Sequence, residues 1–124
     1  MEIEIPLHWY KNKTKKTSLS MNNYRNWHYQ TSNKIKHNVS DYLRQFDFPL
    51  FDKVSITYTL VFKDKVKRDI MNFVAVADKF ILDHLVTIGS LRDDNYHYVR
   101  SYKIKPVISG DENKIIMEIE EIDK

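Results

Sequence analysis

The stretch from Lys67 to Asp94 brings together side chains that can hold a divalent cation against a phosphate group. A basic pair, Lys67 and Arg68, precedes Asp69, and the twin acid Asp93-Asp94 closes the stretch. Carboxylate oxygens are ligands that Mg²⁺ prefers, and neighbouring cations favour a phosphate ester. We therefore take this stretch as a candidate site for metal-assisted chemistry on a phosphodiester.

Helical periodicity follows Asp69 and predicts a helix over residues 70–86. At about 100° per residue, Asn72, Lys79 and Asp83 share one edge with Asp69, whereas Asp78 points away from that edge. A polar edge of this kind lines a site in some proteins, and any half-exposed helix also has one. The expected buried stripe is Phe73, Ala77, Phe80, Ile81 and Leu85.

Helix geometry restricts which acids share a metal ion. Asp69 and Asp83 are separated by roughly 21 Å along a straight helix, and Asp69 and Asp78 by roughly 13 Å. A carboxylate oxygen lies about 2.0–2.1 Å from Mg²⁺, so neither pair can bind one ion. Asp93 or Asp94 can join Asp69 only if the chain returns along the helix.

Each acid also has a structural interpretation. Asp69 stands immediately before a helix, where Asp is a preferred N-cap. Asp93 and Asp94 precede a predicted strand, where Asp is common in turns. Both interpretations are compatible with a role in a site.

The chain of 124 residues is expected to form a single domain over residues 1–124. It contains no cysteine, which excludes disulfides, thiolate zinc sites and a cysteine nucleophile. No apolar run approaches the roughly 20 residues of a membrane span, so we expect no membrane partner.

The net charge of +3 and the isoelectric point of about 9.0 are mildly basic. The basic residues crowd the first third of the chain, whereas the last residues are acidic, and this asymmetry suits a protein that binds a polyanion on one face. A solvated lysine-rich surface explains the charge equally well. The expected DNA-binding residues are Lys11, Lys13, Lys15, Lys16, Arg25, Lys34, Lys36, Lys67 and Arg68.

Alternation and periodicity predict strands over 2–9, 53–62, 95–107 and 114–122, and helices over 34–45 and 70–86. Residues 11–23 are polar and basic and are expected to form a mobile loop. The order β-α-β-α-β-β predicts an α+β domain, with two helices packed on one face of a small mixed sheet.

The stretch resembles the RusA-type Holliday junction resolvases of phages and prophages. The similarity extends more weakly to the opening Ile-Glu-Ile-Pro-Leu and to the asparagine pair in the basic loop, in the family's order. The residues that carry it are Arg68-Asp69-Ile70-Met71-Asn72, then Lys79, then Asp83-His84-Leu85, then Asp93-Asp94.

The resemblance implies a homodimeric nuclease of RusA-like fold that binds branched DNA and resolves four-way junctions by paired symmetric nicks. It implies Mg²⁺, with Mn²⁺ as a substitute, and a location in the cytoplasm of a bacterial host. By this resemblance, the catalytic residues would be Asp69, Asp94 and Lys79. The metal-binding residues would be Asp69, Asp93 and Asp94. The possible supporting residues would be Asn72, Asp78 and Asp83.

Two departures from the family pattern bear on this hypothesis. Met71 occupies the position of a second metal-binding Asp, and a thioether is a poor ligand for a hard cation. The helix is also four residues longer before Asp83 than in the family. Lys79 matches the family's lysine if the insertion precedes it; otherwise that position falls on Ala75.

Three other functions remain open from the sequence. One is a catalytically silent junction-binding dimer, which Met71 favours. Another is a nuclease that cuts flaps or forks. The third is a small interaction protein with no DNA role.

Overall fold

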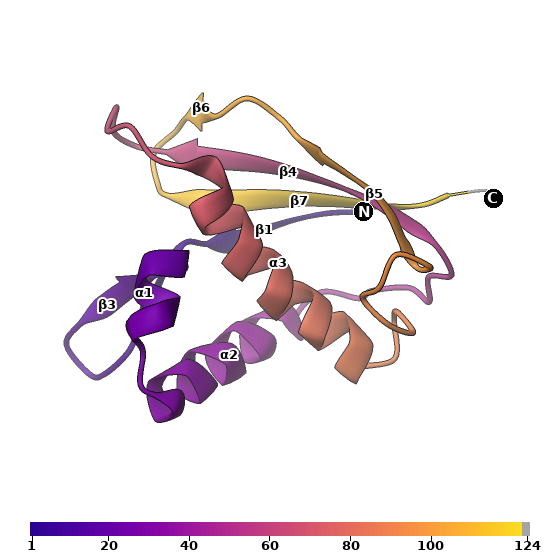
Figure 1. The fold of residues 1–124 in the computed structure, drawn as a ribbon, viewed down its shortest axis with the longest axis horizontal. Helices are drawn as coiled ribbons and strands as arrows, with labels where there is room; N and C mark the ends of the chain where they lie inside the picture. The colour runs from indigo at the N-terminus through magenta and orange to yellow at the C-terminus, as the bar shows by residue number, and fades with distance from the viewer. Residues whose placement is uncertain (123–124) are drawn as a thin grey trace.

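The computed structural model describes residues 1–122, which form an α+β fold with helices on one side of a mixed sheet (Figure 1). The elements, in chain order, are β1 (Glu2–Pro6), β2 (His8–Tyr10), β3 (Lys16–Ser18), α1 (Met21–Asn26), α2 (Tyr29–Leu43), β4 (Val54–Phe62), α3 (Ile70–Thr87), β5 (Val99–Ile104), β6 (Ile108–Ser109) and β7 (Lys114–Glu121).

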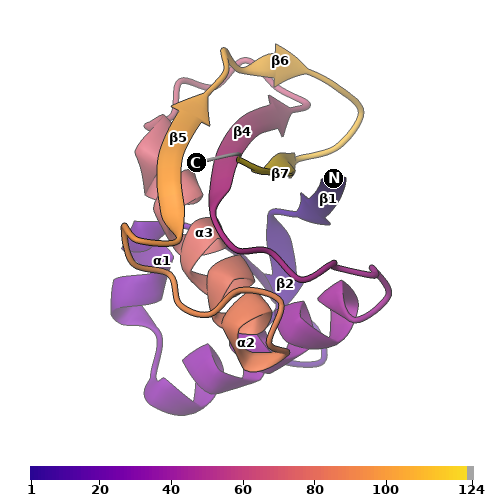
Figure 2. The ribbon, with the colours of Figure 1, turned by 90° about the vertical axis from the view of Figure 1, so that its right-hand side faces the viewer.

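Strand β4 is central to the main sheet, whose order is β1-β7-β4-β5 (Figure 2). Strand β7 pairs antiparallel with β4 along most of its length, from Val54↔Glu121 to Val61↔Lys114. On the other side of β4, β5 and then β6 pair with it in parallel. Buried and exposed positions do not alternate along β4, because most residues from Val54 to Phe62 are buried and the others are half-buried.

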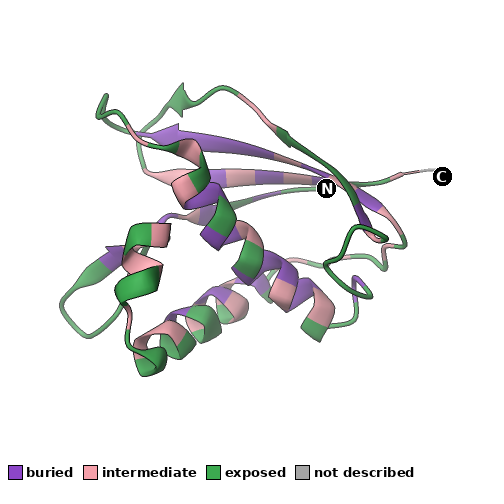
Figure 3. Ribbon diagram, viewed as in Figure 1, coloured by how far each residue is buried: buried purple, intermediate pink, exposed green. Residues whose placement is uncertain are grey.

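Helix α3 lies between the sheet and the two other helices, α1 and α2, which both contact it (Figure 1). The predicted stripe is buried, and so are Val74, Val76, Leu82 and His84 (Figure 3). A helix covered on two sides needs a wider apolar surface than a single stripe. The core therefore runs from the sheet through α3 to α2.

The chain enters and leaves α3 at opposite ends of β4. Residues 63–69 connect the end of β4 to the start of α3. After α3, the backbone N–H of Phe51 donates to the carbonyl of Ser90 at 2.8 Å, which holds the helix end against the segment before β4. Helix α3 thus runs back along β4, in the opposite direction.

The expected α+β class, with helices on one face of a mixed sheet, is confirmed. The expected count of two helices was wrong, because residues 1–122 contain three, and α2 begins at Tyr29 rather than near residue 34. Of the strand expected over 95–107, only β5 (Val99–Ile104) forms, and the short strand β6 follows it after residues 105–107, which include Pro106.

The polar segment 11–23 does not form the expected loop throughout. Strands β2 and β3 pair as a hairpin, with Trp9 opposite Thr17, and α1 begins at Met21. Leu7 lies between β1 and β2, and its carbonyl accepts from the N–H of Leu19 at 2.8 Å. Both leucines are fully buried, so the basic hairpin is anchored to the core.

Within residues 1–122, no helix is long and apolar enough to cross a bilayer.

Gly110 provides a test of how closely the last connection packs. A Cβ atom at Gly110 would lie 2.5 Å from Cγ1 of Val61, a buried and β-branched side chain. We expect Gly110→Ala to lower the free energy of unfolding by about 1–3 kcal/mol, as overpacking typically does. Urea denaturation measures this.

The matched control is Ser109→Ala at the neighbouring exposed position, which should change stability by less than about 0.5 kcal/mol. Equal stability of the two variants would contradict the close packing of this connection on β4.

Candidate functional site

Asp69 is the N-cap of α3, as one of its two interpretations predicted. Its backbone is extended, and its Oδ1 accepts a hydrogen bond from the N–H of Met71 at 3.1 Å. That contact satisfies one of the free N–H groups at the helix start. Asp69 can cap the helix and also bind a ligand, because only Oδ1 accepts the capping hydrogen bond and the carboxylate has a second oxygen.

A depression of about 320 Å³ surrounds this helix start. Its lining joins the Lys67–Asn72 segment to α1, whose Asn22 donates its backbone N–H to Oδ1 of Asn72 at 3.3 Å. The asparagine pair and the acidic motif, 50 positions apart, therefore meet at one place. The lining residues are Asn22, Lys67, Arg68, Asp69, Asn72 and Phe73.

Arg68 is fixed in the wall of this depression. Its guanidinium donates to both carboxylate oxygens of Asp64, at 2.6 and 2.9 Å, and lies 4.4 Å from the ring centroid of Phe62. The hydrogen bond from Arg68 lowers the pKa of Asp64 to about 2. Lys67 is exposed and adds a second cation beside Asp69.

The twin acid lies in the loop between α3 and β5. Oδ1 of Asp93 accepts from the backbone N–H of Asp94 at 2.7 Å, and its Oδ2 accepts from the side chain of Asn95 at 3.1 Å. Asp93 therefore stabilises a turn, as its structural interpretation predicted. Asp94 is exposed in the same turn.

Asp94 lies near Asp78, not near Asp69. Its charge raises the pKa of Asp78 and also that of Tyr102, although burial is the larger cause at both groups. Asp78 faces β4 and β5, whereas Asp69 and Asn72 face the depression near α1. The loop thus returns to the middle of α3 and does not reach its start.

Asp78 joins α3 to the sheet through two phenols. Its two carboxylate oxygens accept from the hydroxyls of Tyr58 on β4 at 2.5 Å and Tyr102 on β5 at 2.8 Å. The tyrosine rings are stacked, with centroids 6.4 Å apart. Burial raises the pKa of Asp78, while the two phenol hydrogen bonds act in the opposite direction.

Sequence reasoning missed both tyrosines. A signal for Tyr58 was present, because it alternates with apolar residues on a strand predicted to be buried, and a buried phenol needs a hydrogen-bond partner. No comparable signal existed for Tyr102.

Met71 lies on the side of α3 that carries Asp78. Its side chain lines an apolar depression of about 330 Å³, together with Val74 and Ala75 one helical turn further along. Tyr102 and Ile104 of β5 complete the lining. Met71 therefore faces β5.

Asp69, Asp93 and Asp94 do not form one cluster. Within residues 1–122, no three His, Asp or Glu side chains gather closely enough to bind a metal ion together. The cause is the direction of α3: its first residue follows β4, whereas the Asp93-Asp94 turn precedes β5, whose start pairs with the opposite end of β4. The metal role of these acids stays a prediction.

Lys79 and Asp83 form an ion-pair network on the side of α3 that faces α2. Oδ2 of Asp83 lies 3.1 Å from the amine of Lys36 on α2 and 4.0 Å from the amine of Lys79. Asp83 therefore holds two cations at the outer surface, which gives it a structural role. The catalytic role of Lys79 stays a prediction.

The remaining basic residues of the predicted DNA surface are exposed on neighbouring elements. Arg25 lies in the last turn of α1, and Lys34 on α2. The lysines of the hairpin are Lys11, Lys13, Lys15 and Lys16.

No family model matches the chain, and no curated protein matches it in sequence.

Asp78 provides a stability test of the tyrosine contact. Asp78→Ala leaves the fully buried hydroxyl of Tyr58 without its acceptor, so we expect the free energy of unfolding to fall by about 1–3 kcal/mol. Asp78→Asn should cost less, because its amide oxygen still accepts one hydrogen bond. Urea denaturation measures both.

Asp47→Ala is the control, since Asp47 is an exposed aspartate outside the sheet. If Asp78→Ala is no more destabilising than Asp47→Ala, Asp78 does not hold α3 to the sheet.

Proposed function

We propose that this protein is a Mg²⁺-dependent, structure-specific endodeoxyribonuclease of the RusA type, which resolves four-way DNA junctions by paired symmetric nicks. The observation that carries the proposal is the depression at the start of α3. It combines an exposed acid, Asp69, and an amide, Asn72, with the cations Lys67 and Arg68.

Hydrolysis of a phosphodiester requires that the negative charge of the phosphate be offset as the bond breaks. Lys67 and Arg68 would bind the phosphate backbone beside Asp69. Arg68 is already oriented by Asp64, so its binding of phosphate loses little side-chain entropy. Lys79, also on α3, is the proposed additional cation for the transition state.

The donor chemistry of the depression fits Mg²⁺. In phosphate-processing sites, Mg²⁺ typically takes one or two carboxylates and completes its coordination with water and substrate phosphate. Asp69 and Asn72 would hold the ion on the α1 side of α3, and Asp93 and Asp94 remain a separate proposed acidic set. When bound, the metal polarises the scissile phosphate and lowers the pKa of an attacking water.

The exposed lysines of the β2–β3 hairpin extend the cationic surface beyond the depression. Such contacts bind DNA without regard to sequence, so junction binding should weaken steeply with salt. Branched DNA is therefore the proposed partner. Paired nicks require two active sites, so the acting form would be a homodimer in the host cytoplasm.

Junction cleavage tests the proposal. With Mg²⁺, Asp69→Asn and Asp94→Asn should each slow the cutting of a synthetic four-way junction, on the order of 100-fold for loss of a group worth a few kcal/mol. Single-turnover cleavage followed on denaturing gels measures the rates.

Glu120→Gln, at an exposed acid on the far strand β7, is the charge-matched control and should cut as wild type does. Wild-type rates for both aspartate variants would contradict the assignment.

The second candidate is a catalytically silent junction-binding dimer. One observation favours it: Met71 stands where the RusA-type family has a metal-binding carboxylate. Mg²⁺-independent binding of junctions without any cleavage would support this candidate over the nuclease.

Met71→Asp separates the two candidates. Because Met71 faces β5 and not Asn72, our proposal expects the new carboxylate to change the cleavage rate by less than about tenfold, or 1.4 kcal/mol. The silent-binder hypothesis expects cleavage to appear where wild type has none. Ala75→Asp places a carboxylate one turn along the same face and is the control for added charge.

A further inference from the structure

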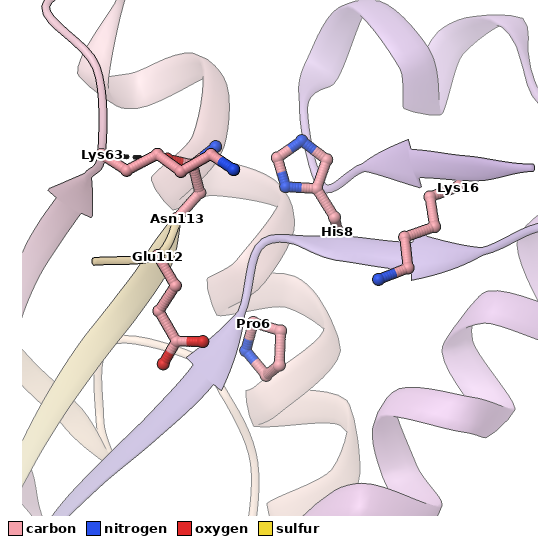
Figure 4. A pocket seen from close by; sticks show the side chains of 6 residues that line it. All are labelled: Pro6, His8, Lys16, Lys63, Glu112 and Asn113. Atoms are coloured by element: carbon pink, nitrogen blue, oxygen red, sulfur yellow. Dashed lines mark hydrogen bonds between the residues drawn. The ribbon is translucent and has the colours of Figure 1, made fainter. Parts of the chain in front are cut away.

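A second depression, of about 390 Å³, is lined by basic side chains from separate parts of the chain (Figure 4). His8 comes from β2, Lys16 from β3 and Lys63 from the residue after β4. Pro6, Glu112 and Asn113 complete the lining. None of the RusA-like motif residues belongs to this depression.

Backbone hydrogen bonds fix the walls of this basic depression. The N–H of Lys63 donates to Oδ1 of Asn113 at 2.9 Å, and the N–H of Leu7 donates to the Asn113 carbonyl at 3.2 Å. Asn113 thereby joins the end of β4 to Leu7, the residue between β1 and β2. Ligand binding would therefore require little backbone rearrangement.

The balance of charge in the depression is positive. Lys16 lies 4.8 Å from the ring centroid of Tyr10, and neither Lys16 nor Lys63 has a carboxylate within 4.0 Å among the described residues. The one acid in the lining, Glu112, lies 3.8 Å from the amine of Lys114, which also pairs with Glu4. The negative charge of Glu112 is thus partly offset from outside the depression.

The pKa of His8 reflects the positive charge of its neighbours. Its pKa is lowered by burial and then by the charges of Lys16, Lys63 and Arg68. Arg68 belongs to the depression at the start of α3, so the two depressions share one electrostatic environment. An anion in the basic depression would lie close to the proposed cleavage site.

We propose that the basic depression binds a backbone phosphate of a DNA arm, with His8 and Lys63 as phosphate-binding residues beside Lys16. This inference rests on the proposed function, which supplies duplex DNA as the ligand. DNA is favoured over a free anion because the cationic surface continues on both sides, through the hairpin lysines and through Lys67.

Phosphate binding at this position would be coupled to protonation. A phosphate offsets the charges of Lys16, Lys63 and Arg68, which favours the charged form of His8. Glu112 is the one acid that lines the depression with His8. His8 should take up a proton when DNA binds. Affinity should therefore rise as the pH falls from 8 to 6, by at most tenfold per pH unit for one proton.

The test measures junction binding in EDTA, so that cleavage plays no part. Fluorescence anisotropy with a labelled four-way junction would compare wild type with Lys63→Gln and with Lys103→Gln, a charge-matched change at an exposed lysine on β5. Loss of one phosphate contact should weaken binding about eightfold at 0.1 M salt and reduce the salt slope by about 0.9. Lys103→Gln should match wild type.

The pH arm uses His8→Gln with His97→Gln, an exposed histidine in the loop before β5, as its control. The rise in affinity at low pH should persist in His97→Gln and be largely lost in His8→Gln. Circular dichroism of each variant checks that a loss of binding is not a loss of folding.

The outcomes separate this inference from the proposed function. If wild type binds junctions and Lys63→Gln matches Lys103→Gln, the basic depression does not bind a DNA phosphate, and the nuclease proposal is unaffected. If wild type binds no DNA, both fail. If inorganic phosphate at millimolar concentration saturates a shift of the His8 ring resonances while Lys63→Gln leaves DNA binding unchanged, the depression binds a free anion and the DNA assignment is overturned.

Discussion

Helix α3 packs between β4 on one side and α1 and α2 on the other, and this packing determines where each candidate side chain lies. The helix begins where β4 ends and finishes against the segment that precedes β4. Asp69 is therefore at one end of the sheet, and the loop with Asp94 starts from the other. The acids of one sequence motif are therefore distributed along a buried helix and do not gather at one end of it.

Helix α3 passes through two different chemical environments, one at its start and one at its middle. At its start, Asp69 and Asn72 are accessible and surrounded by cations, which suits a phosphate ester and a hard metal ion. In its middle, Asp78 is held by two phenols and desolvated, so its ionised form is disfavoured. The charge of Arg68 in this first environment also acts on His8 in the basic depression. Phosphate chemistry is therefore better supported at the start of α3 than at its middle.

Strong local signals allowed part of this arrangement to be predicted from the sequence. The buried stripe of α3, the central strand β4 and the cap at Asp69 depend on neighbours in the chain, so periodicity and N-cap preference were sufficient. The hairpin was missed because its strands have only three residues each and are anchored by two leucines, Leu7 before the polar segment 11–23 and Leu19 within it.

The partners of Asp78 were missed for a related reason. Tyr58 and Tyr102 meet it only because β4 and β5 pair in parallel across 46 positions of sequence, for example at Ser55↔Ser101. The return of Asp94 to Asp69 was left open by chain length alone, since the loop could span the distance. The pairing of β5 instead brings the loop toward Asp78, and no local sequence pattern determines that pairing.

The proposed metal site at Asp69 is tested most clearly by anomalous diffraction from crystals of the protein bound to a four-way junction in Mn²⁺. We predict an ion at the carboxylate of Asp69, between the protein and a DNA phosphate. Mn²⁺ bound to the DNA but absent from Asp69 would contradict the proposed site.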